Sequence, residues 1–332
     1  MEVMNGVVAL LVSFIMIAWL LGSSENAVAN IIRKTKLLAI GITHMLLSKD
    51  KKFKARQDPD AVVVDPNAPT KRIVFLRHGE SEWNEVFNRG FGPSFLVRLV
   101  SALIREALLL TTRDSVFFDS PLSDTGIKQT QELVRFLQRP QGSVADPKVD
   151  EIVAILNGEA AKGSVLTTSN LRRAIATGLI VFWDRLRQTR ENFLVLSCLQ
   201  EVTFNVDGIS LLENGEVPDG SVGRALGQEI AFDAEFNAGT KGLRSNGYAR
   251  MGEFCKWASA RPEDTVVCAG HSLWFRDFFR NFLPFAARHA SKQKKIVNCG
   301  VIAFTLQQGT LNGRPAYKVD PASITVVYGG FK

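Results

Sequence analysis

Short apolar runs alternate along the chain with longer segments in which apolar residues recur at helical spacing. Runs rich in β-branched and aromatic residues predict five strands: Ile73–Leu76, Val165–Thr168, Phe193–Ser197, Thr265–Ala269 and Val301–Leu306. Helices are expected near residues 126–138, 170–188, 246–260 and 272–282. This alternation of strands and helices predicts an α/β fold, built as a three-layer α/β/α domain.

The longest apolar stretch runs from Met4 to Gly22 and contains no charged residue. Nineteen helical residues span about 28 Å, close to the thickness of the hydrocarbon core. Trp19 near its end suits a membrane interface. We therefore expect an N-terminal transmembrane helix in residues 1–22. A cleaved signal peptide is the alternative, because Ala27–Ala29 offers a small-residue cleavage pattern; the length of the run and the lack of a preceding Lys or Arg favour the anchor.

The net charge is +7, and the basic excess is local. Arg33, Lys34 and Lys36 follow the expected span, and the positive-inside rule then places the rest of the chain on the cytoplasmic or mitochondrial matrix side of a membrane. Because the basic cluster adjoins an apolar segment, we expect a single-pass membrane protein and no nucleic-acid partner. A solvated linker and a membrane-surface role fit the cluster equally well.

Two further segments precede the α/β region. Leu37–Leu47 is too short to span a bilayer and suits an amphipathic helix on a membrane surface, with His44 at the interface. Residues 57–70, with three prolines, are typical of a linker. The expected organisation is therefore a span in residues 1–22, a basic juxtamembrane segment and linker in 23–70, and the α/β domain in 71–332.

Four cysteines, at positions 198, 255, 268 and 299, form no Cys-x-x-Cys pair. Cys268 and Cys299 lie in apolar runs and are expected to be small buried side chains. Neither a disulfide framework nor a zinc site is indicated. We expect no metal and no cofactor.

Candidate chemistry lies where the first predicted strand ends. Residues 77–84 read Arg-His-Gly-Glu-Ser-Glu-Trp-Asn, and ligands of α/β sheets bind beyond the carboxyl ends of strands. Arg77 supplies a planar fork for phosphate oxygens, and His78 can act as nucleophile or proton carrier. His271 follows another predicted strand in the same way. Two histidines at one edge of a sheet predict a phosphate pocket.

Residues 77–84 resemble the signature of the histidine phosphatase superfamily, which includes the cofactor-dependent phosphoglycerate mutases. Further segments resemble the family's other motifs in the same order: Pro121–Gln129, Ser169–Ala174, Leu199–Glu201 and Gly270–Ser272. The resemblance covers about residues 71 to 308 and implies a phosphoglycerate mutase-like domain. Ser169 is expected to cap the following helix, with an arginine in the opening turns; family spacing selects Arg173 over Arg172.

The resemblance also implies a mechanism. His78 would attack phosphorus and form phosphohistidine, while Glu201 would protonate the leaving oxygen and later take a proton from water. The residues expected to hold the phosphoryl group are Arg77, Arg173, His271 and Asn84, and His271 is also counted as catalytic. We expect the two histidines to lie within about 10 Å of each other, because one phosphoryl group must contact both.

The sequence departs from the mutases after Glu201. Mutases carry Arg-His-Tyr-Gly there, whereas this chain has Val202–Asn205. This favours a membrane-anchored phosphomonoesterase acting on a phosphorylated small molecule or phosphoprotein. Mutase-type phosphoryl transfer, and a structural subunit of a membrane complex built on this fold, remain as alternatives, and so does a homo-oligomer.

Two segments read as insertions into the domain, near residues 91–118 and 211–241. Within the first, Pro93–Leu110 predicts an apolar helix that would cap the pocket or pack on a membrane or partner. The second, rich in Gly, Glu and Asn, is expected on the surface.

Overall fold

The computed structural model describes residues 25–53, 58–140, 142, 146–218 and 230–332. The expected span at residues 4–22 lies outside these ranges. Within them, no helix combines the length and the apolar character that crossing a membrane requires.

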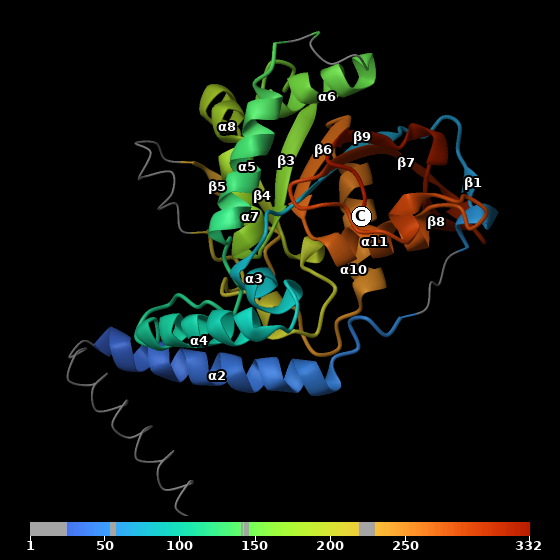
Figure 1. Cartoon of the computed structure of the whole chain (residues 1–332). Coiled ribbons are helices and arrows are strands. Elements are labelled where there is room, and N and C mark those ends of the chain that lie inside the picture. Colours follow the sequence, from blue (N-terminus) through green and yellow to red (C-terminus); the bar gives the residue numbers. More distant parts are fainter. Residues whose placement is uncertain (1–24, 54–57, 141, 143–145, 219–229) are drawn as a thin grey trace, which may run out of the picture.

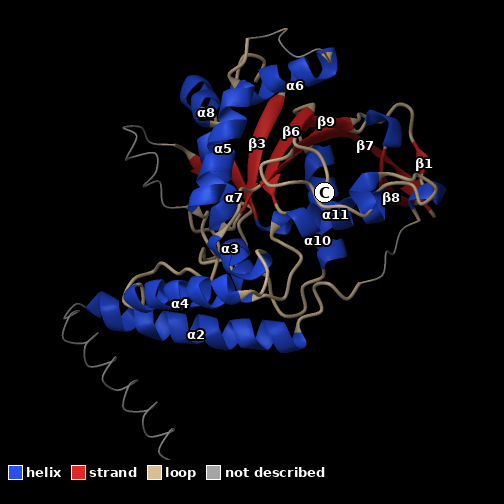
Figure 2. Ribbon diagram, viewed as in Figure 1, coloured by secondary structure: helices blue, strands red, loops and turns tan. Residues whose placement is uncertain are grey.

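A central sheet organises the described chain (Figure 2). The strand β2 (Lys71–Arg77) runs parallel to β6 (Thr265–Gly270) on one side and antiparallel to β7 (Val301–Leu311) on the other. Beyond β6 follow the parallel strands β3 (Ser164–Ser169), β4 (Phe193–Leu196) and β5 (Phe232–Asp233). Beyond β2, three strands pair antiparallel with β7: β1 (Val63–Val64), β8 (Arg314–Val319) and β9 (Thr325–Tyr328).

Helices cover both faces of the sheet (Figure 1). One face carries α5 (Asp124–Leu137), α6 (Pro147–Asn157), α7 (Arg172–Val181) and α8 (Trp183–Thr189). The other carries α10 (Gly247–Ala260) and α11 (Ser272–Phe282). β2 is buried on both sides, because Ile73 and Phe75 face the second layer while Val74 and Leu76 face the first. The fold is therefore mixed α/β with helices on both faces of a central sheet, as expected.

The predicted strands all lie within observed strands, apart from Ser197, which begins the short 3-10 helix η2 (Ser197–Leu199). The expected helix at residues 170–188 is divided at Phe182 into α7 and α8. The helix α6 was not expected. The prediction of a plain linker at residues 57–70 is wrong for residues 62–64, because Val62 is buried and β1 joins the edge of the sheet.

The helix α2 (Glu25–Leu47) lies beside α4 (Pro93–Leu108), below the sheet in Figure 1. Asn30 Nδ2 donates to the carbonyl oxygen of Thr111 at 2.9 Å, and Lys34 Nζ donates to that of Leu109 at 2.6 Å. Leu37 packs into a small core with Phe118 and the segment around Ile209. The helix expected at residues 93–110 is confirmed as α4 and ends two residues earlier, at Leu108; its inner face packs on the domain.

These contacts place two polar residues of the basic segment. Lys34, one of the three cations from which the orientation was predicted, is buried and pairs with Glu106, and the orientation stays a prediction. His44 was expected at an interface, yet it is buried against the domain. Burial also lowers the pKa of the His44 imidazole.

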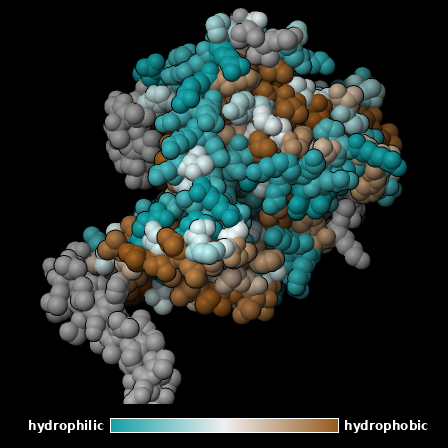
Figure 3. Space-filling model, in the orientation of Figure 1, coloured by the Kyte–Doolittle hydropathy of each residue, from teal (hydrophilic) through white to brown (hydrophobic). Residues whose placement is uncertain are grey.

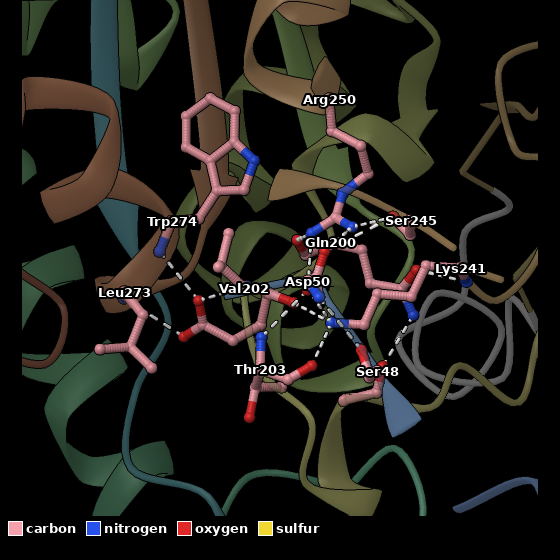
Figure 4. Close-up of polar contacts among 12 residues, drawn as sticks. Ser48, Asp50, Gln200, Val202, Thr203, Lys241, Ser245, Arg250, Leu273 and Trp274 are labelled. Carbon is pink, nitrogen blue, oxygen red and sulfur yellow. Dashed lines mark hydrogen bonds and ion pairs between the residues drawn. The ribbon is translucent and has the colours of Figure 1, made fainter. Parts of the chain in front are cut away.

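A buried ion cluster ties the N-terminal segment to the domain (Figure 4). Asp50, fully buried after α2, accepts from Lys241 Nζ at 2.6 Å and from Arg250 Nη1 at 2.6 Å. It also accepts from the backbone N–H of Thr203 at 3.2 Å. Burial raises the pKa of Asp50, but Lys241 and Arg250 outweigh that effect and leave it below its ordinary value. Asp50 is therefore an ionised interior residue of the domain.

The segment 211–241 is less superficial than expected. Leu211, Asn237 and Lys241 are buried, and β5 forms the last parallel strand of the sheet. The expectation of a surface insertion is therefore wrong for these residues. Gly, Glu and Asn content alone does not show which residues of a loop turn inward.

The first prediction concerns Asp50→Asn. Removing one partner of a buried ion cluster leaves Lys241 uncompensated, so we expect the free energy of unfolding to fall by about 3–5 kcal/mol. Urea denaturation of the detergent-solubilised full chain measures this. The matched control is Asp264→Asn at an exposed position, which should change stability by less than about 0.5 kcal/mol. Equal stabilities for the two variants would contradict the role given to Asp50.

Candidate functional site

The pairing of β2 with β6 brings the two histidines together. Arg77 lies opposite Gly270 in the parallel register, and the backbone N–H of His78 donates to the Gly270 carbonyl at 3.0 Å. The rings of His78 and His271 then lie 5.1 Å apart, centroid to centroid. This meets the expected separation, while the catalytic roles of both residues remain a prediction.

The loop after β2 needs glycine for a steric reason. A Cβ at Gly79 would lie 2.7 Å from the carbonyl oxygen of Gly126, and one at Gly126 would lie 2.0 Å from that of Glu80. The loop therefore rests directly on the first turn of α5. Glu80 accepts from Ser123, the N-cap of α5, and pairs with Arg89, so it has a structural role.

His78 is held as a neutral imidazole with one free nitrogen. Its Nδ1 lies 2.5 Å from the carbonyl oxygen of Gly79. Because a carbonyl only accepts, Nδ1 carries the proton and Nε2 keeps its lone pair. Burial, with Arg173 and Arg77 nearby, holds the pKa of His78 well below its ordinary value. An unprotonated Nε2 is what a nucleophilic histidine requires.

Arg173 lies in the first turn of α7 and is almost fully buried. Its Nη1 donates to the carbonyl oxygen of Asp207 at 2.8 Å, and its Nη2 lies 3.3 Å from the Asp207 carboxylate. Arg172, the alternative in the sequence, instead bonds Asp119 and Asp114 outside the pocket. The structure thus brings Arg173, and not Arg172, into the site.

Ser169 does not cap α7 as expected. The N-cap of α7 is Leu171, whose side chain makes no capping bond, and the N–H of Arg172, the first helical residue, donates to Asp119 Oδ1 at 2.7 Å. Ser169 Oγ lies instead 2.8 Å from His271 Nε2 and so orients that ring. Burial, followed by the positive charge of Arg173, holds the pKa of His271 well below its ordinary value.

Arg77 is buried next to His78 and lines the same pocket. Its Nη1 donates to the carbonyl oxygen of Ile296 at 2.6 Å. Burial lowers the pKa of Arg77 to about 10, so the guanidinium stays protonated at neutral pH. The pocket therefore holds two arginine cations beside the neutral imidazole of His78, an arrangement that favours an anion.

Glu201 lies at the N-terminus of α11. Its Oε1 accepts from the backbone N–H groups of Val202 and Trp274, each at 2.9 Å, and its Oε2 accepts from that of Leu273 at 3.3 Å (Figure 4). Burial raises the pKa of Glu201, while Arg173 and these N–H groups act in the opposite direction without cancelling the rise. A carboxyl group with a raised pKa beside a neutral imidazole can deliver a proton.

Of the expected site residues, Arg77, His78, Asn84, Arg173 and Glu201 line one small cavity of about 130 Å³. His271, fully buried beside His78, does not line it. That volume suits a phosphoryl-sized group and is well below the 300–1,000 Å³ of pockets that enclose whole drug-sized ligands. Several buried polar atoms of this cluster have no hydrogen-bond partner among the described residues: Arg77 Nε, Asn84 Oδ1, Asp207 Oδ1 and His271 Nδ1. Buried polar atoms are normally bonded, so their concentration here indicates a site for a polar ligand.

Sequence reasoning missed some of the lining. Thr203, Asn205 and Lys295 line the cavity from loops, and Asp207 lines it from the short 3-10 helix η3 (Val206–Gly208). Trp83 and Asn88 line it from α3 (Glu82–Asn88), together with the expected Asn84. No local pattern marks Lys295, which lies in a loop that pairs through its backbone with Lys332. The segment after Glu201 was noted, but nothing in it indicated that Asp207 would pair with Arg173.

No three His, Cys, Asp or Glu side chains gather as metal ligands within the described ranges. The four cysteines are free and buried, as expected for two of them, and none lines the cavity. The positive charge in this site comes from arginine and lysine side chains.

Comparisons with known proteins give a distant likeness only. No protein-family model matches the chain, and no curated protein matches it. Among solved structures, a mycobacterial glucosyl-3-phosphoglycerate phosphatase shares 14% identity at a TM-score of 0.37, over 75% of this chain and 97% of its own. A phosphoglycerate mutase from Bacillus anthracis shares 14% identity at a TM-score of 0.36, and the match covers 77% of this chain and 94% of the mutase. A phosphoglycerate mutase from Thermus thermophilus shares 13% identity at a TM-score of 0.31, and the match covers 75% of this chain and 98% of the mutase. Scores this low carry no argument about the function of this chain.

The second prediction follows from the buried neutral histidines. The unfolded chain takes up protons below the ordinary histidine pKa of 6.5, whereas folded His78 and His271 take them up only at lower pH. Stability should therefore be fully present above pH 6.5 and fall as the pH drops below it. In His78→Gln, the free energy of unfolding should fall less steeply with decreasing pH than in wild type, as measured by urea denaturation at a series of pH values. The control is His289→Gln, where the ring is less buried and the change should be smaller; equal slopes in wild type and His78→Gln would contradict the assignment.

Proposed function

We propose that the chain is a phosphomonoesterase that acts through a phosphohistidine intermediate on His78. The observation that carries this proposal is the geometry of His78. Its Nδ1 is fixed on the Gly79 carbonyl, its Nε2 is free, and it lies in a cavity that also holds Arg77, Arg173 and the buried carboxyl group of Glu201. This arrangement provides a nucleophile, cations for the phosphoryl oxygens and a proton donor in one place.

In the first step, His78 Nε2 forms a bond to phosphorus as the bond between phosphorus and the ester oxygen breaks. Glu201 gives its proton to that oxygen, which leaves as an alcohol. Arg77 and Arg173 stabilise the charge on the transferring group. Asn84 lines the cavity and can donate to a phosphoryl oxygen through its Nδ2, and His271, beside His78, can donate through Nδ1, which has no partner among the described residues.

In the second step, water attacks phosphorus and the bond to Nε2 breaks. The Glu201 carboxylate takes the proton of the water, which restores its acid form, and inorganic phosphate leaves. The net reaction converts a phosphomonoester and water into an alcohol and phosphate.

Hydrolysis is favoured over mutase-type transfer by the segment after Glu201. Where the mutases of the superfamily this chain resembles carry cationic side chains, Val202 is fully buried, and the backbone of Thr203 is held by Asp50. No arginine follows Glu201 to hold a sugar acid. The substrate class is therefore a phosphomonoester, from a small molecule or a phosphoprotein, whose phosphoryl group alone enters the cavity.

The uncharged stretch at residues 4–22 supports a membrane location for this activity. We include in the proposal a single-pass anchor there, with the described domain on the cytoplasmic or mitochondrial matrix side. The orientation rests on Arg33, Lys34 and Lys36, which follow the stretch directly; Lys36 is exposed, Lys34 pairs with Glu106 and Arg33 donates to the carbonyl oxygen of Leu211.

The third prediction tests the nucleophile and the acid. His78→Ala should abolish the phosphoenzyme and nearly all hydrolysis, because no other free imidazole nitrogen is fixed in this way in the cavity. Glu201→Gln should slow turnover of poor leaving groups by about 10²–10⁴-fold, since proton transfer to the leaving oxygen is lost. Rapid quenching of a radiolabelled phosphomonoester measures both the intermediate and its decay.

The matched control is His289→Ala, which removes a histidine remote from the cavity and should keep wild-type turnover. Undiminished hydrolysis in His78→Ala would refute the mechanism. Transfer of the phosphoryl group to a sugar acid faster than to water would instead assign mutase activity. A wild-type protein that forms no phosphoenzyme with any phosphomonoester would favour a structural subunit built on this fold.

The fourth prediction tests the anchor. Ile15→Arg should weaken insertion, because an arginine at the centre of a span costs about 2.5–3.5 kcal/mol on insertion scales. The measurement is extraction of the tagged protein with alkaline carbonate, with Ile15→Leu as the matched control. A wild-type protein found in the soluble fraction with a new N-terminus at Asn30 would show a cleaved signal instead. Protease protection of the domain on the opposite side would overturn only the orientation.

A further inference from the structure

The helix α2 has its apolar face turned outward. Its buried stripe holds small or polar residues together with one large apolar residue: Ala27, Lys34, Leu37, Gly41 and His44. Its exposed stripe holds Val28, Ile32, Leu38, Ile42, Met45 and Leu46. A helix that packs on a domain in water usually shows the reverse arrangement. The outer face of α2 is thus more apolar than the face it buries.

Close packing on the inner face explains the small residues there. A Cβ at Gly41 would lie 2.8 Å from Val206 Cγ1 and 3.3 Å from the ring of Phe118. The helix therefore lies against the domain at a fixed rotation. Rotating α2 about its axis to bury the apolar stripe would remove the packing of Gly41 and also the contacts of Leu37 and Lys34.

The helix α4 repeats this reversal. Its inner side contributes Ala102, fully buried, and Glu106, which pairs with Lys34 and accepts from the backbone N–H of Val116 at 2.6 Å. Its outer side carries six exposed apolar residues: Leu96, Val97, Val100, Leu103, Ile104 and Leu108. The two helices are thus joined through polar contacts and present apolar residues outward.

These residues form one surface, here called the platform: the exposed apolar side chains of α2 and α4. Figure 3 shows the brown area along the lower side of the molecule, over the two helices. Eight exposed large hydrophobic residues lie on α2 and six on α4, out of 23 in the described chain. So strong a concentration on two helices marks an interaction surface.

The charges around the platform indicate what covers it. Its two helices contain only two acids, Glu25 at the start of α2 and Glu106, which points inward. The exposed charged residues beside the apolar stripes are basic, with Lys36 on α2 and Lys49, Lys51 and Lys52 directly after it. An apolar face with a basic edge matches the boundary between lipid tails and anionic headgroups.

The sequence before α2 points to the same occupant. The uncharged stretch of residues 4–22 ends three residues before Glu25, where α2 begins. A span there would deliver α2 to the membrane surface. A second copy of the chain would have to bring two basic edges together, which like-charge repulsion disfavours.

We propose that the platform of α2 and α4 lies in the interfacial layer of a lipid bilayer, so that the domain rests on the membrane along these two helices. The proposal takes only the membrane location from the proposed function and does not depend on phosphatase activity. The lipid provides an apolar environment for the outer stripes, while phosphate headgroups pair with the basic side chains at the edge.

Single-cysteine labelling tests directly whether the platform enters the bilayer. The four native cysteines are buried, so an environment-sensitive fluorophore can be placed on Val100→Cys or Leu46→Cys in the full chain. The control is Val326→Cys on β9, which is similarly exposed but remote from the platform (Figure 1). The protein is reconstituted into vesicles of phosphatidylcholine and phosphatidylserine that carry lipid-bound nitroxide quenchers.

At positions 100 and 46, emission should shift to shorter wavelength and be quenched about two-fold or more, because the platform would enter the bilayer by about 5–10 Å. Emission at position 326 should be unchanged. Equal, weak quenching at all three positions overturns the proposal. A shift at position 100 that follows protein concentration and not the lipid quencher also overturns it, and shows that a second copy covers the platform.

A second experiment separates the platform from the anchor. In an Ile15→Arg background, the chain should still float with anionic vesicles but become extractable by carbonate. Adding Val100→Glu and Ile104→Glu should lower the floated fraction about ten-fold, since charge in the interface opposes burial. Val326→Glu with Phe285→Glu in the same background is the matched control and should float like the parent.

Equal flotation of the platform variant and its control would refute the proposal. Hydrolysis of a soluble phosphomonoester should be the same in both, because neither pair of substitutions lies in the cavity. If the wild-type protein hydrolyses no phosphomonoester but is still quenched at positions 100 and 46 and floats as expected, only the proposed function is contradicted.

Discussion

The parallel register of β2 with β6 is the constraint on which the site depends. With Arg77 opposite Gly270, the residues that follow both strands leave the sheet at one edge, and the two imidazoles must lie side by side. A shift of one residue would turn Ile73 and Phe75 toward the wrong helical layer. The register is therefore specified by the burial of β2 on both faces, and the positions of His78 and His271 follow from it.

A second constraint joins the N-terminal segment to the same site. Lys241 Nζ donates to the carbonyl oxygens of Glu201 and Thr203 as well as to Asp50. The backbone that carries Glu201 is thus held by a lysine whose charge is compensated by a residue located before β1. A domain boundary at residue 70 would remove Asp50 and leave Lys241 buried without its counter-ion, which is a costly arrangement. The segment after α2 is physically part of the domain.

The strands of the sheet and the residues of the pocket were predicted from different kinds of sequence signal. Buried strands such as β2 and β6 carry a strong local signal, so their positions and the histidines after them could be predicted. Arg173 needed the resemblance, because Arg172 beside it has the same chemistry and only the geometry of α7 separates them. Asp207, Lys295 and Asp50 could not be predicted, because their partners are distant in sequence and no periodicity marks a polar residue that a loop turns inward.

The hydrophobic pattern of α2 and α4 shows a further limit of such reasoning. Periodicity identifies an apolar stripe, but it does not tell whether that stripe faces the domain or the surroundings. Here the polar contacts of Lys34 and Glu106 decide the rotation of both helices and leave the apolar stripes outside. Arg105 of α4 then binds both carboxylate oxygens of Glu82, each at 2.6 Å, and so fixes α3, whose Trp83 and Asn84 line the cavity. Because α3 contacts α4 and supplies part of the cavity lining, any surface that holds the platform also sets the position of the cavity relative to that surface.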